Sequence, residues 1–351
     1  MMKSFLLPIA DIRQETADTL TICFTQPKVD RIHYYAGQYL TIKVEIEEES
    51  YWRSYSISST PGLEAYLSIT VKRVPGGIVS NYIHDHWQVG TKVSFLRPSG
   101  RFLTHFSVKN TRHIWLWGAG SGITPLMSIL KGILYQEPHS RVSLIYGNKT
   151  EEDIIFKDQL EELSDRFSDR LQVVHFLSRE TNTRVNEARL GRLEDVGAIY
   201  EELREEPVLP ETHFLCGPSS MMAKIQKNLR QLNVPAAAIK QEAFQVDEEM
   251  QTDQAAASGP TYKVKVKWLG EVHEVWVPPG QTLLDAGLAQ GLDFPYACKR
   301  GTCATCMGRL KTGEVKMQNP AALLDFEVEL GKILVCQTIP ISEDIEIEIG
   351  V

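Results

Sequence analysis

The sequence contains six cysteines in 351 residues, and three of them fall within one nine-residue segment. Cys298, Cys303 and Cys306 have the spacing C-x4-C-x2-C, and Cys336 is the only cysteine further downstream. Zinc sites usually consist of two CxxC pairs, whereas this spacing is typical of a plant-type 2Fe-2S cluster, in which four thiolates bind two irons. We therefore predict that these four cysteines are metal ligands.

A disulfide framework is the other common use of clustered thiols, and it requires an oxidising compartment. The first apolar run, FLLPIA, has six residues and is followed by Asp11, whereas the apolar core of a signal peptide has about 7 to 15. The sequence also has no run of about 18 uncharged apolar residues, as a membrane span needs. We therefore expect a cytoplasmic protein with no membrane association, in which the thiols stay reduced.

Small residues surround the clustered cysteines. Gly301 and the residues Thr302, Ala304 and Thr305 allow the backbone to approach a cluster and to donate N–H groups to its sulfur atoms, which helps to set the potential. The segment 262–291 before them has the pattern of a β-hairpin followed by a helix that ends at Gly291.

The rest of the chain divides into units with different patterns. Residues 1–107 contain short, alternating, β-branched segments separated by Gly, Pro and acidic turns, which predicts an antiparallel β-barrel. Residues 108–244 alternate strand and helix patterns, which predicts an α/β, doubly wound parallel sheet. Residues 245–261 begin with acids and end with Ala, Ser, Gly and Pro, which predicts a linker. Residues 262–351 would then be a small domain of their own.

The net charge of −8 is concentrated in the C-terminal part of the chain. Residues 1–245 hold 28 basic and 29 acidic side chains, and residues 246–351 hold 9 and 16. A nucleic-acid-binding protein needs a basic surface, so this balance argues against a nucleic acid as a partner. The acidic part can steer a basic protein partner, but a solvated surface that keeps the chain soluble explains it equally well.

Two segments of the predicted barrel carry groups suited to a phosphate and a flat ring. In YWRSYSISST, Arg53 can neutralise a pyrophosphate, Tyr55 can pack on a ring system, and Ser56 offers a hydroxyl to a ring nitrogen. One hairpin later, residues 76–80 form a Gly-Gly turn and a helix start, which is able to bind phosphate. Each segment alone is common, so the argument depends on their order and spacing.

The first strand-to-helix turn of the second unit is rich in glycine. WGAGSGITPLMSIL contains Gly118, Gly120 and Gly122, and Thr124 follows as the expected N-cap of a helix. The segment departs from GxGxxG because position 123 is isoleucine, and the segment YGNK, at the end of the next strand, has no acid for a ribose. An ordinary NAD-type Rossmann site is therefore not expected here.

Taken in order, these segments resemble the ferredoxin-NADP reductase superfamily with a plant-type ferredoxin domain at the C-terminus. The glycine loop is similar to the superfamily pattern GxGxGxTP, CGPSSMM at 216–222 is similar to its last strand-to-helix turn, and residues 262–351 are similar to the α+β, β-grasp ferredoxin. The resemblance covers nearly the whole chain and implies a flavin, a nicotinamide nucleotide and a 2Fe-2S cluster. Because GGIVSNYI is similar to FAD-type relatives, FAD is expected rather than FMN, which stays open.

The resemblance also implies roles for single residues, with Ser56, Cys216 and Phe244 as the catalytic ones. Cys216 would lie near the nicotinamide, or be a small buried core residue; Phe244 would cover the flavin, or be a core aromatic. Ser178 and Arg179 match the pair that NADP-using relatives place on the 2′-phosphate, so NADPH is expected rather than NADH, although an exposed arginine can be a solvated bystander. The other expected cofactor-binding residues are Val71, Lys72, Gly76, Gly77, Ile78, Val79, Ser80, Gly217 and Pro218.

The whole layout looks like the reductase component of a multicomponent bacterial oxygenase. In such a protein NADPH reduces the flavin, and the cluster passes single electrons to the oxygenase. The stretches GAGSGITPLMSIL, YGNKTEEDIIFKDQLEEL and LSRE look most like reductase subunits of phenylacetyl-CoA epoxidases, while reductases of steroid hydroxylases and of desaturases share the layout. Two other classes are an electron-transfer or redox-sensing subunit without nicotinamide turnover, and a stand-alone diaphorase, which needs no ferredoxin domain.

Overall fold

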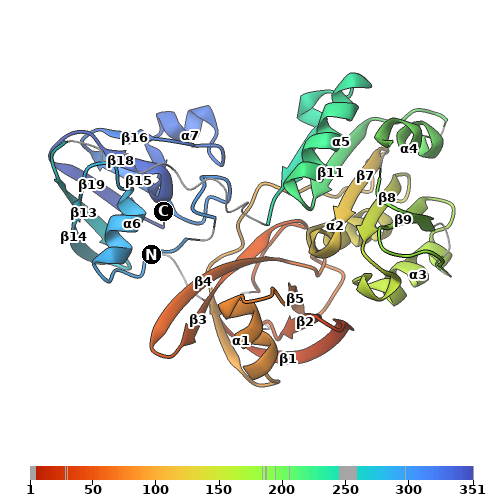
Figure 1. The fold of residues 1–351 in the computed structure, drawn as a ribbon, viewed down its shortest axis with the longest axis horizontal. Coiled ribbons are helices and arrows are strands. Elements are labelled where there is room, and N and C mark those ends of the chain that lie inside the picture. The colour runs from red at the N-terminus through yellow and green to blue at the C-terminus, as the bar shows by residue number, and fades with distance from the viewer. Residues whose placement is uncertain are drawn as a thin grey trace.

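A computed structural model (Figure 1) describes residues 5–350, except for residues 28, 30, 184, 186, 187, 194, 205, 245–258 and 297. An antiparallel barrel, a parallel sheet flanked by helices and a small mixed sheet follow one another along the chain. The predicted multidomain fold class is confirmed. The linker predicted at 245–261 lies, up to residue 258, outside the described residues. No helix in the described part of the chain is long and apolar enough to cross a membrane.

The first unit is a barrel of six antiparallel strands in the order β4-β3-β6-β1-β2-β5. It closes where the two outer strands meet, because the Ser58 N–H donates to the Ser68 carbonyl over 2.8 Å. Apolar side chains that alternate along the strands, such as Ile22, Ile42 and Ile69, fill the interior. The strands are β1 (Phe5–Thr16), β2 (Thr19–Phe24), β3 (Tyr39–Ile46), β4 (Glu49–Ser56), β5 (Leu67–Lys72) and β6 (Lys92–Phe95), and helix α1 (Ile78–His86) follows β5.

The second unit is a parallel sheet in the order β10-β9-β8-β7-β11-β12. Ile114 and Leu116 of β7 are buried under α2 and α3, while Trp115 and Trp117 of the same strand are buried under α4 and α5. Helices therefore cover both faces of the sheet. The elements are β7 (His113–Ala119), α2 (Ile123–Gln136), β8 (Arg141–Asn148), α3 (Lys157–Arg166), β9 (Leu171–Leu177), β10 (Ala188–Leu190), α4 (Val196–Leu203), β11 (Glu211–Cys216), α5 (Ser219–Gln231) and β12 (Ile239–Glu242).

The start of α2 differs from the prediction, which placed the N-cap at Thr124. The short 3-10 turn Gly120–Gly122 leads directly into the helix, so Gly122 is the N-cap and Ile123 is already helical. The Thr124 hydroxyl instead donates to the Ser121 carbonyl over 2.7 Å, within this first turn.

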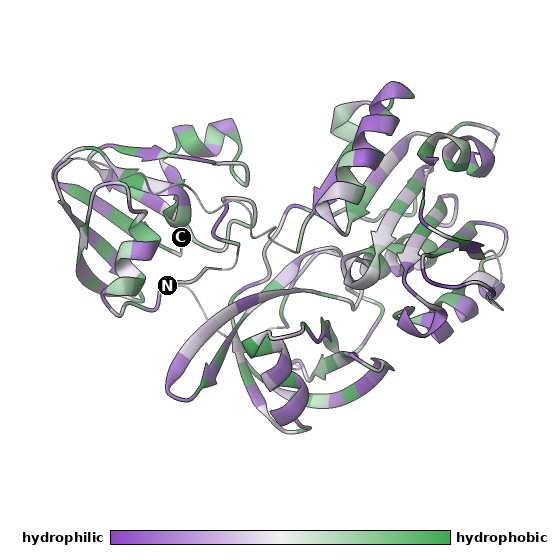
Figure 2. Ribbon diagram, viewed as in Figure 1, coloured by the Kyte–Doolittle hydropathy of each residue, from purple (hydrophilic) through white to green (hydrophobic). Residues whose placement is uncertain are grey.

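The third unit has a five-stranded mixed sheet in the order β14-β13-β19-β15-β17, with a smaller β16–β18 pair. The last strand, β19, is not an edge strand, because it lies between β13 and β15. Figure 2 shows the alternation of apolar and polar residues along these strands. The elements are β13 (Tyr262–Trp268), β14 (Glu271–Val277), α6 (Leu283–Ala289), β15 (Met307–Thr312), β16 (Val315–Met317), α7 (Asp325–Glu329), β17 (Lys332–Leu334), β18 (Thr338–Pro340) and β19 (Ile345–Ile349).

The barrel contacts both of the other units. On the ferredoxin-like side, the Trp52 indole N–H donates to Asp293 over 2.6 Å, and Lys43 forms an ion pair with the same carboxylate at 3.0 Å. On the other side, the Thr60 hydroxyl donates to the Ser128 carbonyl of α2 over 2.9 Å. Strands β3 and β4 therefore lie next to the third unit, as Figure 1 shows.

Candidate functional site

The parallel sheet reverses its order at β7, because β8 lies on one side of this strand and β11 on the other. Ligands of open α/β sheets bind outside the carboxyl ends of the strands at such a point. The two turns that begin here approach closely, since a Cβ on Gly122 would lie only 2.1 Å from the Cys216 carbonyl oxygen. Gly120 has a φ of 51°, the left-handed conformation that glycine adopts readily. Glycine at position 122 therefore lets the two turns pack directly against each other at this edge of the sheet.

The barrel meets this edge of the sheet at Ser56, the last residue of β4. The Ser56 hydroxyl donates to the Glu242 carboxyl over 3.2 Å, and the strand register places Glu242 opposite Cys216. Burial raises the pKa of Glu242 to about 8, although the hydrogen bond from Ser56 opposes the shift. Burial and the nearby Glu242 carboxyl raise the pKa of the Cys216 thiol well above its usual value. Three separate strands therefore bring a hydroxyl, a carboxyl and a thiol together.

Glu242 is a residue that the sequence reasoning missed. It stands in QEAF, two positions before Phe244, and is the last residue of β12. The available signal was a single acid at the carboxyl end of a strand in a parallel sheet, where ligands bind. Only the pairing of β12 with β11 shows that this acid faces Ser56 and Cys216.

The two other predicted catalytic residues have different environments. The Cys216 side chain is fully buried in the core on the α2 side of the sheet, while its carbonyl oxygen borders the Gly122 turn. Phe244 is 42% exposed, so the alternative that it is a core aromatic is wrong. Pro218 is the N-cap of α5. Gly217 lies against Ala119, since a Cβ added to Gly217 would be 3.2 Å from the Cβ of Ala119.

The residues predicted to bind the flavin lie on the barrel. Arg53 and Tyr55 share one face of β4, since side chains two apart point to the same side. At the start of α1, the Ser80 hydroxyl accepts from the Val74 N–H over 3.0 Å and fixes the Gly-Gly turn, with Gly76 at a φ of 71° and Gly77 as N-cap.

Four further residues of this group differ in what they offer a flavin. The Val71 side chain is fully buried in the barrel core, as is most of Val79. Lys72 forms an ion pair with Asp18 at 2.5 Å. Val71 and Lys72 therefore offer a ligand mainly their backbone, whereas the Ile78 side chain is exposed.

The predicted nucleotide-selecting pair follows β9 at the carboxyl edge of the parallel sheet. The Ser178 N–H donates to the Asn148 carbonyl over 3.0 Å, and the Arg179 N–H donates to the Lys149 carbonyl over 2.8 Å. These bonds extend the strand pairing past Leu177 and hold the turn in place, while the Arg179 side chain is exposed. A guanidinium in this position is accessible to an anionic group of a bound nucleotide.

The four predicted cluster ligands meet in one place. The Cys298 thiol contacts the thiols of Cys303 and Cys336, and Cys336 also contacts Cys306. All six cysteines of the chain are free thiols. Hydrogen bonds from the Cys303 and Cys336 thiols lower the pKa of the Cys298 thiol.

The loop around these cysteines is shaped to donate hydrogen bonds to sulfur. The Arg300 N–H donates to the Cys298 sulfur over 3.3 Å, and the Thr302 and Thr305 hydroxyls bond to the Cys298 and Cys303 thiols. Gly301 has a φ of 75°, and a Cβ there would lie 1.9 Å from the Asn319 carbonyl oxygen. The donors and the tight turn fit thiolate sulfurs that carry negative charge.

The four thiols lie in one continuous series of contacts. Cys303 contacts Cys298, Cys298 contacts Cys336, and Cys336 contacts Cys306. A 2Fe-2S cluster requires four cysteine thiolates, so this donor set fits such a cluster.

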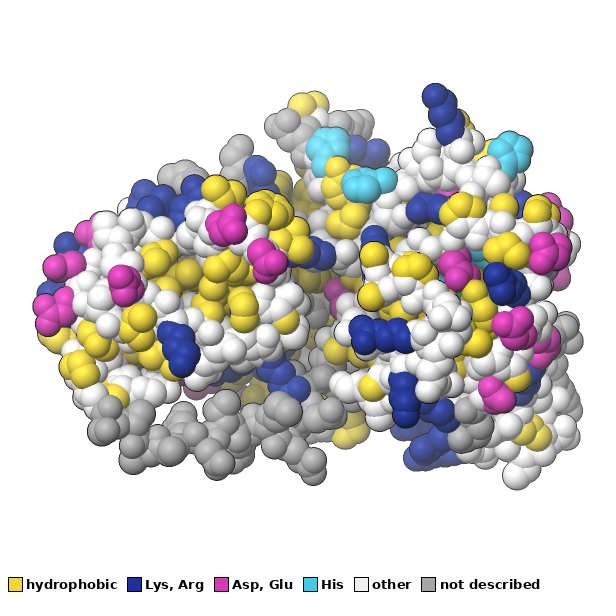
Figure 3. Space-filling model, turned by 90° about the horizontal axis from the view of Figure 1, so that it is seen from above, with side chains coloured by type: hydrophobic (Ala, Val, Ile, Leu, Met, Phe, Trp, Pro, Cys, Tyr) yellow, Lys and Arg dark blue, Asp and Glu magenta, His cyan; other side chains and the backbone are white. Residues whose placement is uncertain are grey.

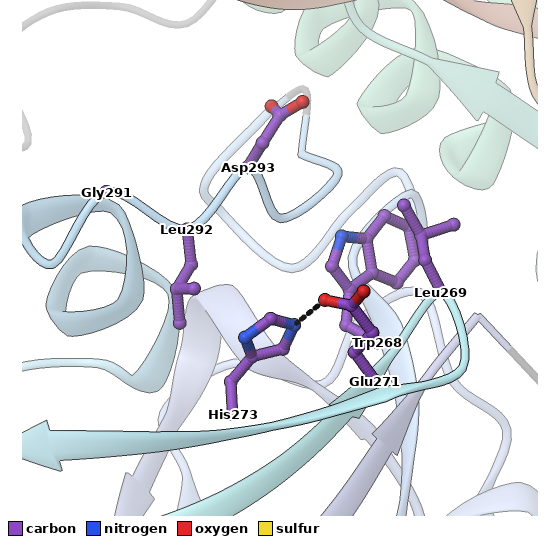
Figure 4. A pocket seen from close by; sticks show the side chains of 7 residues that line it. All are labelled: Trp268, Leu269, Glu271, His273, Gly291, Leu292 and Asp293. Carbon is purple, nitrogen blue, oxygen red and sulfur yellow. Dashed lines mark ion pairs between the residues drawn. The ribbon is translucent and has the colours of Figure 1, made fainter.

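Neither of two cavities found in the structure includes a predicted site residue. One, of about 300 Å³, lies between the β13–β14 turn and the loop after α6 and is lined by Trp268, His273 and Asp293, among others (Figure 4). The other, of about 490 Å³, lies along β9 and α3.

Comparisons with known proteins agree with this geometry. The chain matches the "Oxidoreductase FAD-binding domain" at residues 7–103, the "Oxidoreductase NAD-binding domain" at 116–227 and the "2Fe-2S iron-sulfur cluster binding domain" at 266–340. It is 34% identical to the ferredoxin reductase component of 3-ketosteroid-9-alpha-monooxygenase from Rhodococcus rhodochrous, over 99% of this chain and 97% of the relative. The chain belongs to the ferredoxin-NADP reductase family of oxygenase reductase components with a 2Fe-2S domain.

Further relatives have the same three-part layout. One of the subunits of 1,2-phenylacetyl-CoA epoxidase from Escherichia coli K12 is 33% identical over 97% of this chain and 96% of its own length. The solved structure of phthalate dioxygenase reductase has the same fold, with a TM-score of 0.60 and 22% identity over 99% of this chain and 98% of that one. Members of this family are oxidoreductases, and the predictions of FAD, a nicotinamide cofactor and a 2Fe-2S cluster are confirmed.

Proposed function

We propose that this protein is the reductase component of a multicomponent oxygenase, taking two electrons from NADPH and passing them singly through FAD and the cluster. The observation that carries the proposal is the contact between the cluster loop and the flavin barrel. The Tyr39 hydroxyl of β3 donates to the Cys303 carbonyl, and the Thr305 hydroxyl lies 3.4 Å from that of Ser54. Ser54 precedes Ser56 by two residues on β4, so the cluster loop lies beside the expected flavin site.

The residues of the flavin site have distinct tasks in this proposal. Bound FAD supplies the conversion of one hydride into single electrons. Arg53 and the N-terminus of α1 hold its phosphates, Ser56 presents a hydroxyl to the ring, and Glu242 holds that hydroxyl in place. Phe244, exposed beside this carboxyl, covers the ring until a nicotinamide takes its place.

The nicotinamide half of the site supports turnover rather than electron transfer alone. The turns after β7 and β11 pack against each other, since a Cβ on Gly122 would lie 2.1 Å from the Cys216 carbonyl oxygen. They stand at the carboxyl edge of the sheet where its strand order reverses, which is where open α/β sheets bind their ligands. A subunit that only relays electrons has no use for nucleotide-binding turns at this point. The exposed Arg179 at the carboxyl end of β9 supports NADPH as the donor, because guanidinium binds a phosphate through two hydrogen bonds.

A protein is the acceptor in this proposal, and an apolar surface beside the cluster supports it. Helix α7 lies between Cys306 and Cys336 in the chain and carries and is flanked by exposed apolar side chains, whereas its buried Glu327 forms ion pairs with Lys332 and with Arg101 of the loop after β6. Apolar and acidic side chains gather on this face of the ferredoxin-like unit (Figure 3). Exposed apolar patches commonly mark protein contacts. The exposed residues are Leu324 (50%), Phe326 (54%) and Leu330 (61%).

We take a cytoplasmic phenylacetyl-CoA epoxidase as the partner oxygenase. Support comes from the resemblance of the glycine loop and of the segments after β8 and β9 to its reductase subunit. The identities to the steroid monooxygenase reductase and to the epoxidase relative, 34% and 33%, do not separate these two partners. The test is reconstitution with each oxygenase, in which coupled NADPH consumption with the epoxidase and none with the steroid enzyme is expected. The opposite pattern contradicts this choice of partner but not the reductase function.

The reductase function itself is tested by an anaerobic absorbance titration of the purified protein, first with NADPH and separately with NADH. The expected result is bleaching of the flavin together with loss of the iron-sulfur absorbance, and faster bleaching with NADPH. A protein whose flavin is bleached by neither nucleotide is not a reductase of this kind. Equal rates with both nucleotides contradict only the assignment of Arg179.

A further inference from the structure

Tyr39 is a residue of the flavin barrel whose side chain forms hydrogen bonds with the cluster loop. It is the first residue of β3 and only 5% exposed. The register between β3 and β4 places it directly opposite Ser56, the residue expected at the flavin ring. Its hydroxyl donates to the carbonyl of Cys303, a predicted ligand of the cluster. One side chain thus joins the flavin strand to a ligand of the cluster.

A hydrogen-bond network extends from this contact to the ligand sulfur. The Tyr39 hydroxyl also lies 3.3 Å from the Thr305 hydroxyl, which in turn bonds to the Cys303 thiol. Ser54 approaches the same Thr305 hydroxyl at 3.4 Å and is itself 3.0 Å from the Thr41 hydroxyl. Two hydroxyls of the barrel therefore surround the one that bonds to the cluster ligand.

The Tyr39 ring is held rigidly in this position. Its backbone forms a pair of hydrogen bonds with Ser99, of 2.9 and 3.0 Å. Gly100 covers the ring, since a Cβ there would lie 3.0 Å from two of its carbon atoms.

We propose that Tyr39 is a positioning residue for electron transfer: its hydroxyl fixes the Cys303 loop against the flavin strand and raises the cluster potential while the two units are in contact. The proposal rests on the proposed function. One electron leaves the reduced flavin and reduces one ferric iron of the cluster to ferrous, and Tyr39 keeps its proton. A donor near a ligand stabilises the added negative charge of the reduced cluster, which raises the potential.

The test compares the Tyr39→Phe variant of the full-length holoprotein with Tyr51→Phe, which removes a hydroxyl bound only to Glu49 on the same hairpin. The midpoint potential of the cluster is measured by EPR during titration with dithionite, and amide hydrogen exchange is measured over residues 298–306. In Tyr39→Phe the potential is expected to fall and the loop to exchange faster. Tyr51→Phe is expected to match the wild type in both measurements.

Stopped-flow absorbance measures how the variant changes the rates of flavin and cluster reduction. With NADPH, flavin bleaching in Tyr39→Phe is expected at the wild-type rate, and cluster reduction is expected to be roughly three- to tenfold slower, as the loss of one hydrogen bond allows. Ser54→Ala removes the outer contact to Thr305 and, within the barrel, the contact to Thr41. It is expected to shift the cluster potential and the amide exchange in the same direction as Tyr39→Phe, but by less. If both variants keep the wild-type potential and exchange, the proposal is overturned. Dithionite needs no nicotinamide, so failure of the reductase function leaves this test intact.

Discussion

The two redox sites of this molecule are built in different ways. Three of the four predicted cluster ligands come from one loop, residues 298–306, whose own left-handed residues shape it. The proposed flavin and nicotinamide site instead brings together Ser56 from β4, Cys216 from β11 and Glu242 from β12, strands that lie in two domains. A local site is specified by a short sequence, and a distributed site is specified by packing between distant segments. The two sites should therefore respond differently to single substitutions.

The largest expected effect is on the local site, from Cys336→Ser. Cys336 is buried and contacts two of the other ligands, and a serine hydroxyl is a poor replacement for a thiolate. The variant is expected to lose the iron-sulfur absorbance and to reduce cytochrome c only at background rate with NADPH, while ferricyanide reduction through the flavin persists. Cys23→Ala, at a buried cysteine of the barrel, is the matched control and should keep both activities. Equal loss of ferricyanide reduction would show that the sites are not separable.

A smaller effect on the same loop is expected from Gly301→Ala, with Gly291→Ala as its control. Both glycines have a left-handed backbone, at φ values of 75° and 79°, so both variants incur about 1–2 kcal/mol of backbone strain. Only at Gly301 would the new Cβ meet the Asn319 carbonyl, at 1.9 Å, whereas at Gly291 nothing lies within 4 Å. Iron content per protein and thermal unfolding are the measurements. Equal iron content in the two variants would show that the turn tolerates a side chain.

This contrast also explains how much of the molecule could be predicted from the sequence. Alternation and glycine turns predicted the barrel, the parallel sheet and the ferredoxin fold, and the cysteine spacing predicted the cluster, because these signals are local. Glu242 was missed because its role depends on the β11–β12 register and on a contact with the barrel. The placement of the cluster loop against Tyr39 and Ser54 depends on how the surfaces of two domains fit together. No local pattern in the sequence encodes that fit. The N-cap of α2 was misplaced because the glycine turn continues into the helix.

In the distributed site, Arg179→Ala tests one separate contribution, the binding of the 2′-phosphate of NADPH, on which the other residues of the site do not depend. If the guanidinium binds the 2′-phosphate, kcat/KM for NADPH is expected to fall roughly 10- to 100-fold, the value of a lost charged hydrogen bond, with no change for NADH. Arg166→Ala, on α3 next to Tyr135, is the control and should leave both nucleotides unaffected. Parallel losses for NADPH and NADH would assign Arg179 to folding rather than to nucleotide selection.

The last expected effect concerns stability rather than turnover, and it is the pH dependence that Glu242 contributes. Its pKa in the folded protein, about 8, lies above the usual 4.5 because of burial, so the folded protein binds this proton more tightly than the unfolded chain does. The stabilisation is therefore complete below about pH 4.5 and is lost as the pH rises through about 8. Glu242→Gln is expected to lack this loss, so its Tm gains on the wild type as the pH rises over that window. Glu343→Gln, at an exposed acid, should follow the wild type. Parallel Tm curves for wild type and Glu242→Gln would mean that water reaches the carboxyl and that burial does not raise its pKa.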